Sequence, residues 1–113
     1  MIEQTRTVEE APIACMLTGD ELTERGSEVG AVFQAVEQVR ELADGYEFRF
    51  PGSDAIVSGL LGFMLAERRC CPFFTFELVF EPNLSAIWVR LRGSTAVKEF
   101  VAAAWGEIIA AHV

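Results

Sequence analysis

The chain has 113 residues, of which 51% are hydrophobic, and its 9 basic and 17 acidic side chains give a net charge of -8. This length suits one compact domain and is too short for two. The negative charge argues against a nucleic-acid-binding surface, since phosphate binding needs a basic footprint, and against binding to anionic membranes. The longest apolar run, residues 55–66, is about half of the roughly 20 residues that span a bilayer.

The cysteines and the first residues bear on the compartment. Three cysteines, two of them adjacent, are typical of a reduced cytoplasmic protein and not of a disulfide framework. Residues 1–10 are polar and do not have the pattern of a secretory signal. Residues 1–11 also lack an apolar period, which predicts a flexible leader before a single domain over residues 12–113.

The first half of that domain predicts two strands and two helices. Residues 13–18 alternate as a strand, and a long helix is expected from an N-cap at Asp20 to about Ala43. Its evidence is the helical spacing of Leu22, Val29, Val32, Phe33, Val36 and Val39. A turn at Asp44 leads into an alternating strand over residues 46–50. The second helix is capped by Ser53 or Asp54 and stops near Cys70, because a proline follows.

The last third predicts a β-hairpin and a final helix. Two alternating runs, residues 74–80 and 86–92, pair if Glu81 lies opposite Ala86. That register places two favourable pairs on the outer face, Glu77 with Arg90 and Val79 with Trp88. Residues 93–95 then cap a final helix, whose expected inner stripe is Val97, Val101, Ala104 and Ile108.

The predicted element order is therefore β-α-β-α-β-β-α. Strands with one apolar face need helices on that face alone. The predicted fold class is α/β in the broad sense, and more narrowly α+β. It is a two-layer sandwich in which helices cover one face of a four-stranded mixed or antiparallel sheet. The opposite sheet face is polar except for Val79 and Trp88, and Trp105 lies off the stripe of the final helix. Because no helix is left to cover that face, we expect a homodimer that buries Trp88, Trp105 or both.

The candidate site is the cysteine pair at the end of the second helix. Helical spacing puts one stripe of residues on the core side, namely Ile56, Leu60, Phe63, Glu67 and Cys70. A carboxylate on this stripe is unusual, because burial of an unpaired charge is costly. Cys15 faces inward from the first predicted strand, so the candidate metal ligands are Cys15, Cys70, Cys71 and Glu67. Thiolates form a soft donor set for zinc, copper(I), mercury(II) or trivalent arsenic.

Two other interpretations stay open for these cysteines. Reduced cysteine is among the most buried residue types, so all three could pack as small hydrophobes in a structural or protein-interaction module. A redox-active dithiol is the other interpretation, although a vicinal ring between Cys70 and Cys71 is strained. The chain has no Ser-His-Asp set, no paired-carboxylate signature and no glycine-rich phosphate loop. A non-enzymatic binding role is therefore favoured, with no catalytic or cofactor-binding residue assigned.

The cysteine segment also carries a resemblance. Residues 67–78 read E-R-R-C-C-P-F-F-T-F-E-L, which resembles the E-R-x-C-C-x-F-x-x-F-x-L segment of small, uncharacterised bacterial proteins. Residues 14–18 with 21–22, residues 41–46, and residues 87–89 before Gly93 resemble the same proteins, so that the resemblance covers residues 13 to 105. A similar module occurs fused to some MerR-type regulators. Because such regulators often answer thiophilic metals or oxidative stress, the resemblance implies ligand or metal sensing.

Overall fold

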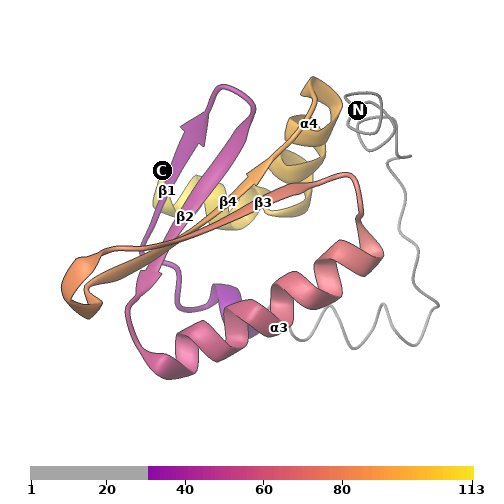
Figure 1. Cartoon of the computed structure of the whole chain (residues 1–113). Coiled ribbons are helices and arrows are strands. Elements are labelled where there is room, and N and C mark those ends of the chain that lie inside the picture. The colour runs from indigo at the N-terminus through magenta and orange to yellow at the C-terminus, as the bar shows by residue number, and fades with distance from the viewer. Residues whose placement is uncertain (1–30) are drawn as a thin grey trace.

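The computed structural model of the protein describes residues 31–113, and Figure 1 labels its helices and strands. In chain order the elements are β1 (Gln38–Leu42), β2 (Gly45–Pro51), α3 (Asp54–Cys70), β3 (Thr75–Phe80), the 3-10 turn η1 (Pro82–Leu84), β4 (Ala86–Arg92), α4 (Thr95–Ala104) and α5 (Gly106–His112). The four strands form one antiparallel sheet in the order β1-β2-β4-β3. The predicted leader and the predicted strand over residues 13–18 lie outside the described residues.

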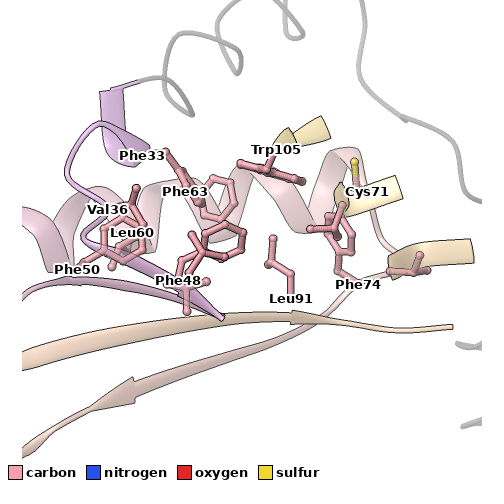
Figure 2. Close-up of a cluster of buried hydrophobic side chains, with 14 of the residues drawn as sticks. Phe33, Val36, Phe48, Phe50, Leu60, Phe63, Cys71, Phe74, Leu91 and Trp105 are labelled. Atoms are coloured by element: carbon pink, nitrogen blue, oxygen red, sulfur yellow. The ribbon is translucent and has the colours of Figure 1, made fainter. Parts of the chain in front are cut away.

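The core lies between one face of this sheet and the helices, as the alternation of the strands requires. Phe48 and Leu91 point inward from β2 and β4 and are 0% exposed. Phe33 packs edge-on against Phe48, with 5.2 Å between ring centroids, and against Phe63 of α3 at 5.1 Å. Figure 2 shows these rings together with Trp105 above the sheet. The predicted α+β fold, with its four-stranded sheet, is confirmed.

The predicted helix from residue 20 to residue 43 is wrong at its C-terminal end. Residues 31–33 are helical, but the chain turns at residues 34–35 and then forms β1. β1 pairs with β2 from Gln38 opposite Arg49 to Leu42 opposite Gly45. The side chains of β1 have good local helix propensity, so pairing with β2 and burial of Val39 override that propensity. Asp44 therefore lies in a hairpin turn and not at a helix end.

The predicted register of the second hairpin is confirmed. Glu77 lies opposite Arg90, and Val79 lies opposite Trp88. The Glu81 N–H donates to the carbonyl of Ala86 at 2.9 Å, which closes the hairpin. The register follows from the alternation, because a slip of one residue would turn Phe76, Leu78 and Phe80 from the inner face to the outer face.

Charged side chains on the outer sheet face pair with one another within the chain. Arg90 donates to Glu47 at 2.9 Å and to Glu77 at 3.2 Å. Arg92 donates to the same Glu77 oxygen at 3.0 Å and to Asp44 at 2.7 Å. The network links β2, β3 and β4 and leaves this face close to neutral, although the chain as a whole is acidic.

Both tryptophans that the sequence suggested for a dimer contact are buried within the chain. Trp88 is 6% exposed, because the guanidinium of Arg40 lies 4.5 Å above its ring and its indole N–H donates to Glu81 at 3.0 Å. Trp105 is 4% exposed and packs on the ring of Phe63. Neither tryptophan is therefore available for a dimer contact, and the expectation that a dimer buries Trp88 or Trp105 is wrong.

The single final helix of the prediction is in fact two helices. The Ser94 hydroxyl caps α4 by accepting from the N–H of Val97 at 3.3 Å, as the sequence indicated. The chain leaves helical geometry at Trp105, with φ -112° and ψ 23°, before α5 begins. This break turns Trp105 into the core and leaves Ala104 exposed, so the predicted inner stripe is wrong at Ala104.

Replacement of Glu77 by glutamine should remove a pH-dependent part of the stability. Hydrogen bonds from Arg92 and then Arg90 hold the pKa of Glu77 below its ordinary value of 4.5. The unfolded carboxyl thus protonates first as pH falls, so its stabilising effect is complete above pH 4.5 and is lost as pH falls through the folded pKa. The melting temperature of Glu77→Gln should lie below wild type at neutral pH and converge with it in acid.

The matched control for this experiment is Glu99→Gln, which changes an exposed carboxylate on α4. Its melting temperature should stay close to that of the wild type throughout the titration. Equal losses in the two variants would mean that the loss of one negative charge, and not the contact with the two arginines, causes the effect.

Candidate thiol site

Helix α3 brings the candidate site residues to one side. The Ser53 hydroxyl accepts from the N–H of Ile56 at 3.2 Å and caps the helix, as predicted. The buried residues of the helix are Leu60, Phe63, Glu67 and Cys70. They are members of the predicted stripe, and Glu67 is 0% exposed. The helical spacing in the sequence therefore located both Glu67 and Cys70 correctly on the core side.

The end of α3 makes the adjacent cysteines converge. Within a regular helix, neighbouring side chains point about 100° apart. Cys71 has already left helical geometry, with φ -128° and ψ 74°, and its N–H donates to the carbonyl of Glu67 at 2.6 Å. As a result the Cys71 thiol donates to the sulfur of Cys70, and the two Sγ atoms are 3.5 Å apart. The helix stop that Pro72 predicts is thus what brings the sulfurs together.

The two sulfurs are in different oxidation states. Cys70 is held in a disulfide bond, whereas Cys71 carries a thiol. The contact between them is a hydrogen bond and not a vicinal disulfide. The expectation that the cysteines are reduced in the cytoplasm stays a prediction.

The two cysteines are buried in a part of the core that contains several aromatic side chains. Cys70 and Cys71 are 2% and 3% exposed, and they belong to the main hydrophobic core. The next residues of the chain, Phe73 and Phe74, lie with their rings 4.9 Å apart, and Phe73 packs on Phe100 at 5.3 Å. Figure 2 shows Cys71 at the same end of the core as Phe74. The two cysteines therefore lie in a buried part of the core that is rich in aromatic rings.

The described part of the site does not make a metal centre by itself. Within residues 31–113 there is no group of three or more histidine, cysteine, aspartate or glutamate side chains that could hold an ion. The structure brings Cys70 and Cys71 together at the end of the helix whose buried stripe includes Glu67. Cys15, the remaining predicted ligand, lies outside the described residues. Arg68 and Arg69, which flank the cysteines in sequence, are exposed.

The sequence analysis missed a groove between α3 and β3. It has a volume of about 510 Å³, and its lining includes Leu61 and Leu65 of α3 and Phe76 and Leu78 of β3. Leu61 is 47% exposed and Leu65 is 61% exposed, although both are large apolar side chains. Leu65 lies off the buried stripe of the helix, and an apolar residue at that position is the signal in the sequence that pointed to a second apolar surface.

No protein-family model, no curated protein and no solved structure matches this chain. Among the described helices, none combines the length and the apolar character that a membrane crossing needs.

Proposed function

We propose that this domain is a sensor that binds a soft metal ion or metalloid through cysteine thiolates. The ligands would be Cys70, Cys71 and Cys15, with Glu67 as a nearby carboxylate. The observation that supports this most is the 3.5 Å separation of the Cys70 and Cys71 sulfurs. A tetrahedral zinc ion with bonds of about 2.3 Å separates two sulfurs by roughly 3.8 Å, so the pair needs to move little to share one ion.

The chemistry of the surroundings supports a soft ion. Sulfur donors favour copper(I), zinc, mercury(II) and trivalent arsenic over hard cations. The buried carboxylate of Glu67 could accept a thiol proton, because each thiol must lose its proton when it binds a metal. The resemblance to a module fused to MerR-type regulators also favours sensing over catalysis, and we assign no catalytic residue.

A redox-active dithiol is the second candidate function, and one observation favours it. The Cys71 thiol lies 3.5 Å from a sulfur that is already part of a disulfide. In thiol–disulfide exchange the Cys71 thiolate would form a bond to Cys70 Sγ while the existing disulfide bond breaks, and the displaced sulfur would leave as a thiolate. Metal binding would then require prior reduction.

Titration of the reduced protein tests the metal site. We expect one equivalent of zinc, mercury(II) or trivalent arsenic to bind tightly, and the affinity to fall by about 100-fold or more in Cys70→Ser or Cys71→Ser. Met64→Leu is the matched control, because it removes a sulfur that lies partly buried on the same helix. If the reduced wild type binds none of these ions better than the double serine variant, the metal function is excluded. If the protein binds a metal ion equally well without reductant, then metal binding does not require reduction of the Cys70 disulfide.

We also propose that the domain works in the cytoplasm as a homodimer that does not bind nucleic acid. The net charge of -8 supports the last point, because it disfavours contact with phosphates. The exposed apolar side chains Leu61, Leu65 and Phe80 support self-association. They replace the buried Trp88 and Trp105 as the reason to expect a dimer.

A further inference from the structure

Strand β3 is an edge strand that lacks the usual protection. Within residues 31–113 it hydrogen-bonds to β4 on one side only, since the strand order is β1-β2-β4-β3. Proteins protect such edges with prolines, lysines, bulges or inward charges, because an open edge pairs with other chains. The sequence of β3 is TFELVF, which contains none of these devices. Its one charge, Glu77, is already paired with Arg90 and Arg92.

The opposite edge of the sheet, strand β1, differs because it carries solvent-exposed charges. β1 exposes Arg40 and Glu41 to solvent, and Lys98 of α4 forms an ion pair with Glu41 at 2.7 Å. These charges would be desolvated if another strand paired with β1, so this edge disfavours pairing. The contrast indicates that, of the two edge strands in the described part of the chain, β3 is the one suited to accept a neighbour.

Apolar side chains extend the open edge into the helix layer. The groove of about 510 Å³ beside β3 is lined on the α3 side by Leu61, Met64 and Leu65, and on the β3 side by Phe74, Phe76 and Leu78. Phe80, at the end of the strand, is 59% exposed. In Figure 1, α3 runs below β3, so that strand edge and helix flank form one side of the molecule. A partner would need an apolar strand backed by an apolar helix.

We propose that β3 pairs antiparallel with β3 of a second copy of this chain, around a twofold axis at Leu78. This assignment rests on the proposed homodimer and names its surface. The pairing would join two four-stranded sheets into one sheet of eight strands. A second copy is the partner that fits, because it presents the same apolar strand edge and the same apolar flank of α3.

The register follows from side-chain alternation. With the axis at Leu78, Phe76 lies opposite the partner's Phe80, and Leu78 lies opposite the partner's Leu78. The inner faces of both sheets then coincide, and Glu77 faces the partner's Val79. An axis at Glu77 would instead set two carboxylates opposite each other, which is unfavourable. The Leu78 axis also uses the strand nearly to its full length, and Leu78 lines the same groove as Leu61.

The test compares two leucines on the two edge strands. Leu78 of β3 and Leu42 of β1 are both partly buried, and a lysine can replace either. By light scattering at high micromolar concentration, the wild-type full chain should have about twice its mass of 12.5 kDa. Leu78→Lys should weaken dimerisation by about 10-fold or more, because two ammonium groups would meet at the axis, and Leu42→Lys should leave it unchanged. Phe80→Lys serves as a second edge variant, since this exposed side chain can change without harm to the fold.

The outcomes separate the edge from the dimer itself. A wild type that stays monomeric overturns both the proposed homodimer and the β3 interface. A wild type that dimerises, with Leu78→Lys and Phe80→Lys dimerising equally well, overturns only the assignment to β3. Amide hydrogen exchange of residues 76–80 provides the third readout, and it should slow as protein concentration rises. Slow exchange even where the protein is monomeric would mean that the edge is covered within its own chain, which also overturns the proposal.

Discussion

Replacement of Leu91 by alanine should lower the free energy of unfolding by about 2–5 kcal/mol. Leu91 is 0% exposed on β4, the strand that pairs with both β2 and β3. Figure 2 places its side chain among the core rings, between Phe48 and Phe74. Removal of the isopropyl group of Leu91 leaves a cavity that the surrounding strands cannot close, because each strand is held by a ladder of hydrogen bonds. Urea unfolding at equilibrium measures the loss.

The matched control is Leu84→Ala in the β3–β4 hairpin. Leu84 is 86% exposed, so its truncation returns little apolar surface to water and should change the free energy of unfolding by less than about 0.5 kcal/mol. Both leucine and alanine also pay a similar steric cost at its positive φ of 55°. Similar losses for the two variants would contradict the position of the core described here.

Replacement of Gly45 by alanine should be at least as damaging, with a loss of about 3 kcal/mol or more. A Cβ atom at this position would overlap with the carbonyl oxygen of Leu91 and would lie 2.9 Å from the Cα of Arg92. Both are backbone atoms of the central strand β4, so neither can rotate out of the way. The first residue of β2 must therefore separate from β4, and the β1–β2 hairpin must shift with it. Thermal and urea unfolding should both detect the change.

Gly62→Ala provides the control for Gly45→Ala. Gly62 is exposed in the middle of α3, and a Cβ atom there meets nothing within 4 Å. Because alanine has a better helix propensity than glycine, this variant should gain up to about 1 kcal/mol. If Gly45→Ala lowers the free energy of unfolding and Gly62→Ala raises it, the loss at Gly45 comes from the contact with the backbone of β4 and not from the substitution itself. A loss at Gly62 would contradict the exposed position of this helix face.

Local signals in the sequence were enough to predict the elements whose apolar residues follow a single period, either that of a strand or that of a helix. The β3–β4 hairpin alternates without ambiguity, so the sequence determined its register, including Glu77 opposite Arg90. Helix α3 has a cap at Ser53, an uninterrupted stripe and a proline after its last turn, so its limits and its buried face were predictable. The same stripe located Glu67 and Cys70 on the core side.

Tertiary structure decided the elements whose local signals conflict or are silent. Residues 38–42 favour a helix by composition, yet they form β1, because the open edge of β2 offers a full ladder of hydrogen bonds and a buried site for Val39. Trp88 has the outward position that alternation predicts, but Arg40 from β1 covers it. No sequence pattern anticipates that cover, since it depends on β1 being a strand.

The thiol site combines both kinds of information. The sequence determined that two cysteines stand where a helix must stop, because Pro72 disfavours helical geometry at the residue before it. Only the folded chain decided that Cys71 turns back toward Cys70, to 3.5 Å between sulfurs, and that both cysteines lie in the buried core with Phe73 and Phe74. Sulfur positions depend on backbone angles beyond the last helical turn. Those angles are set by the packing of α3 and β3 on the core, which no local pattern contains.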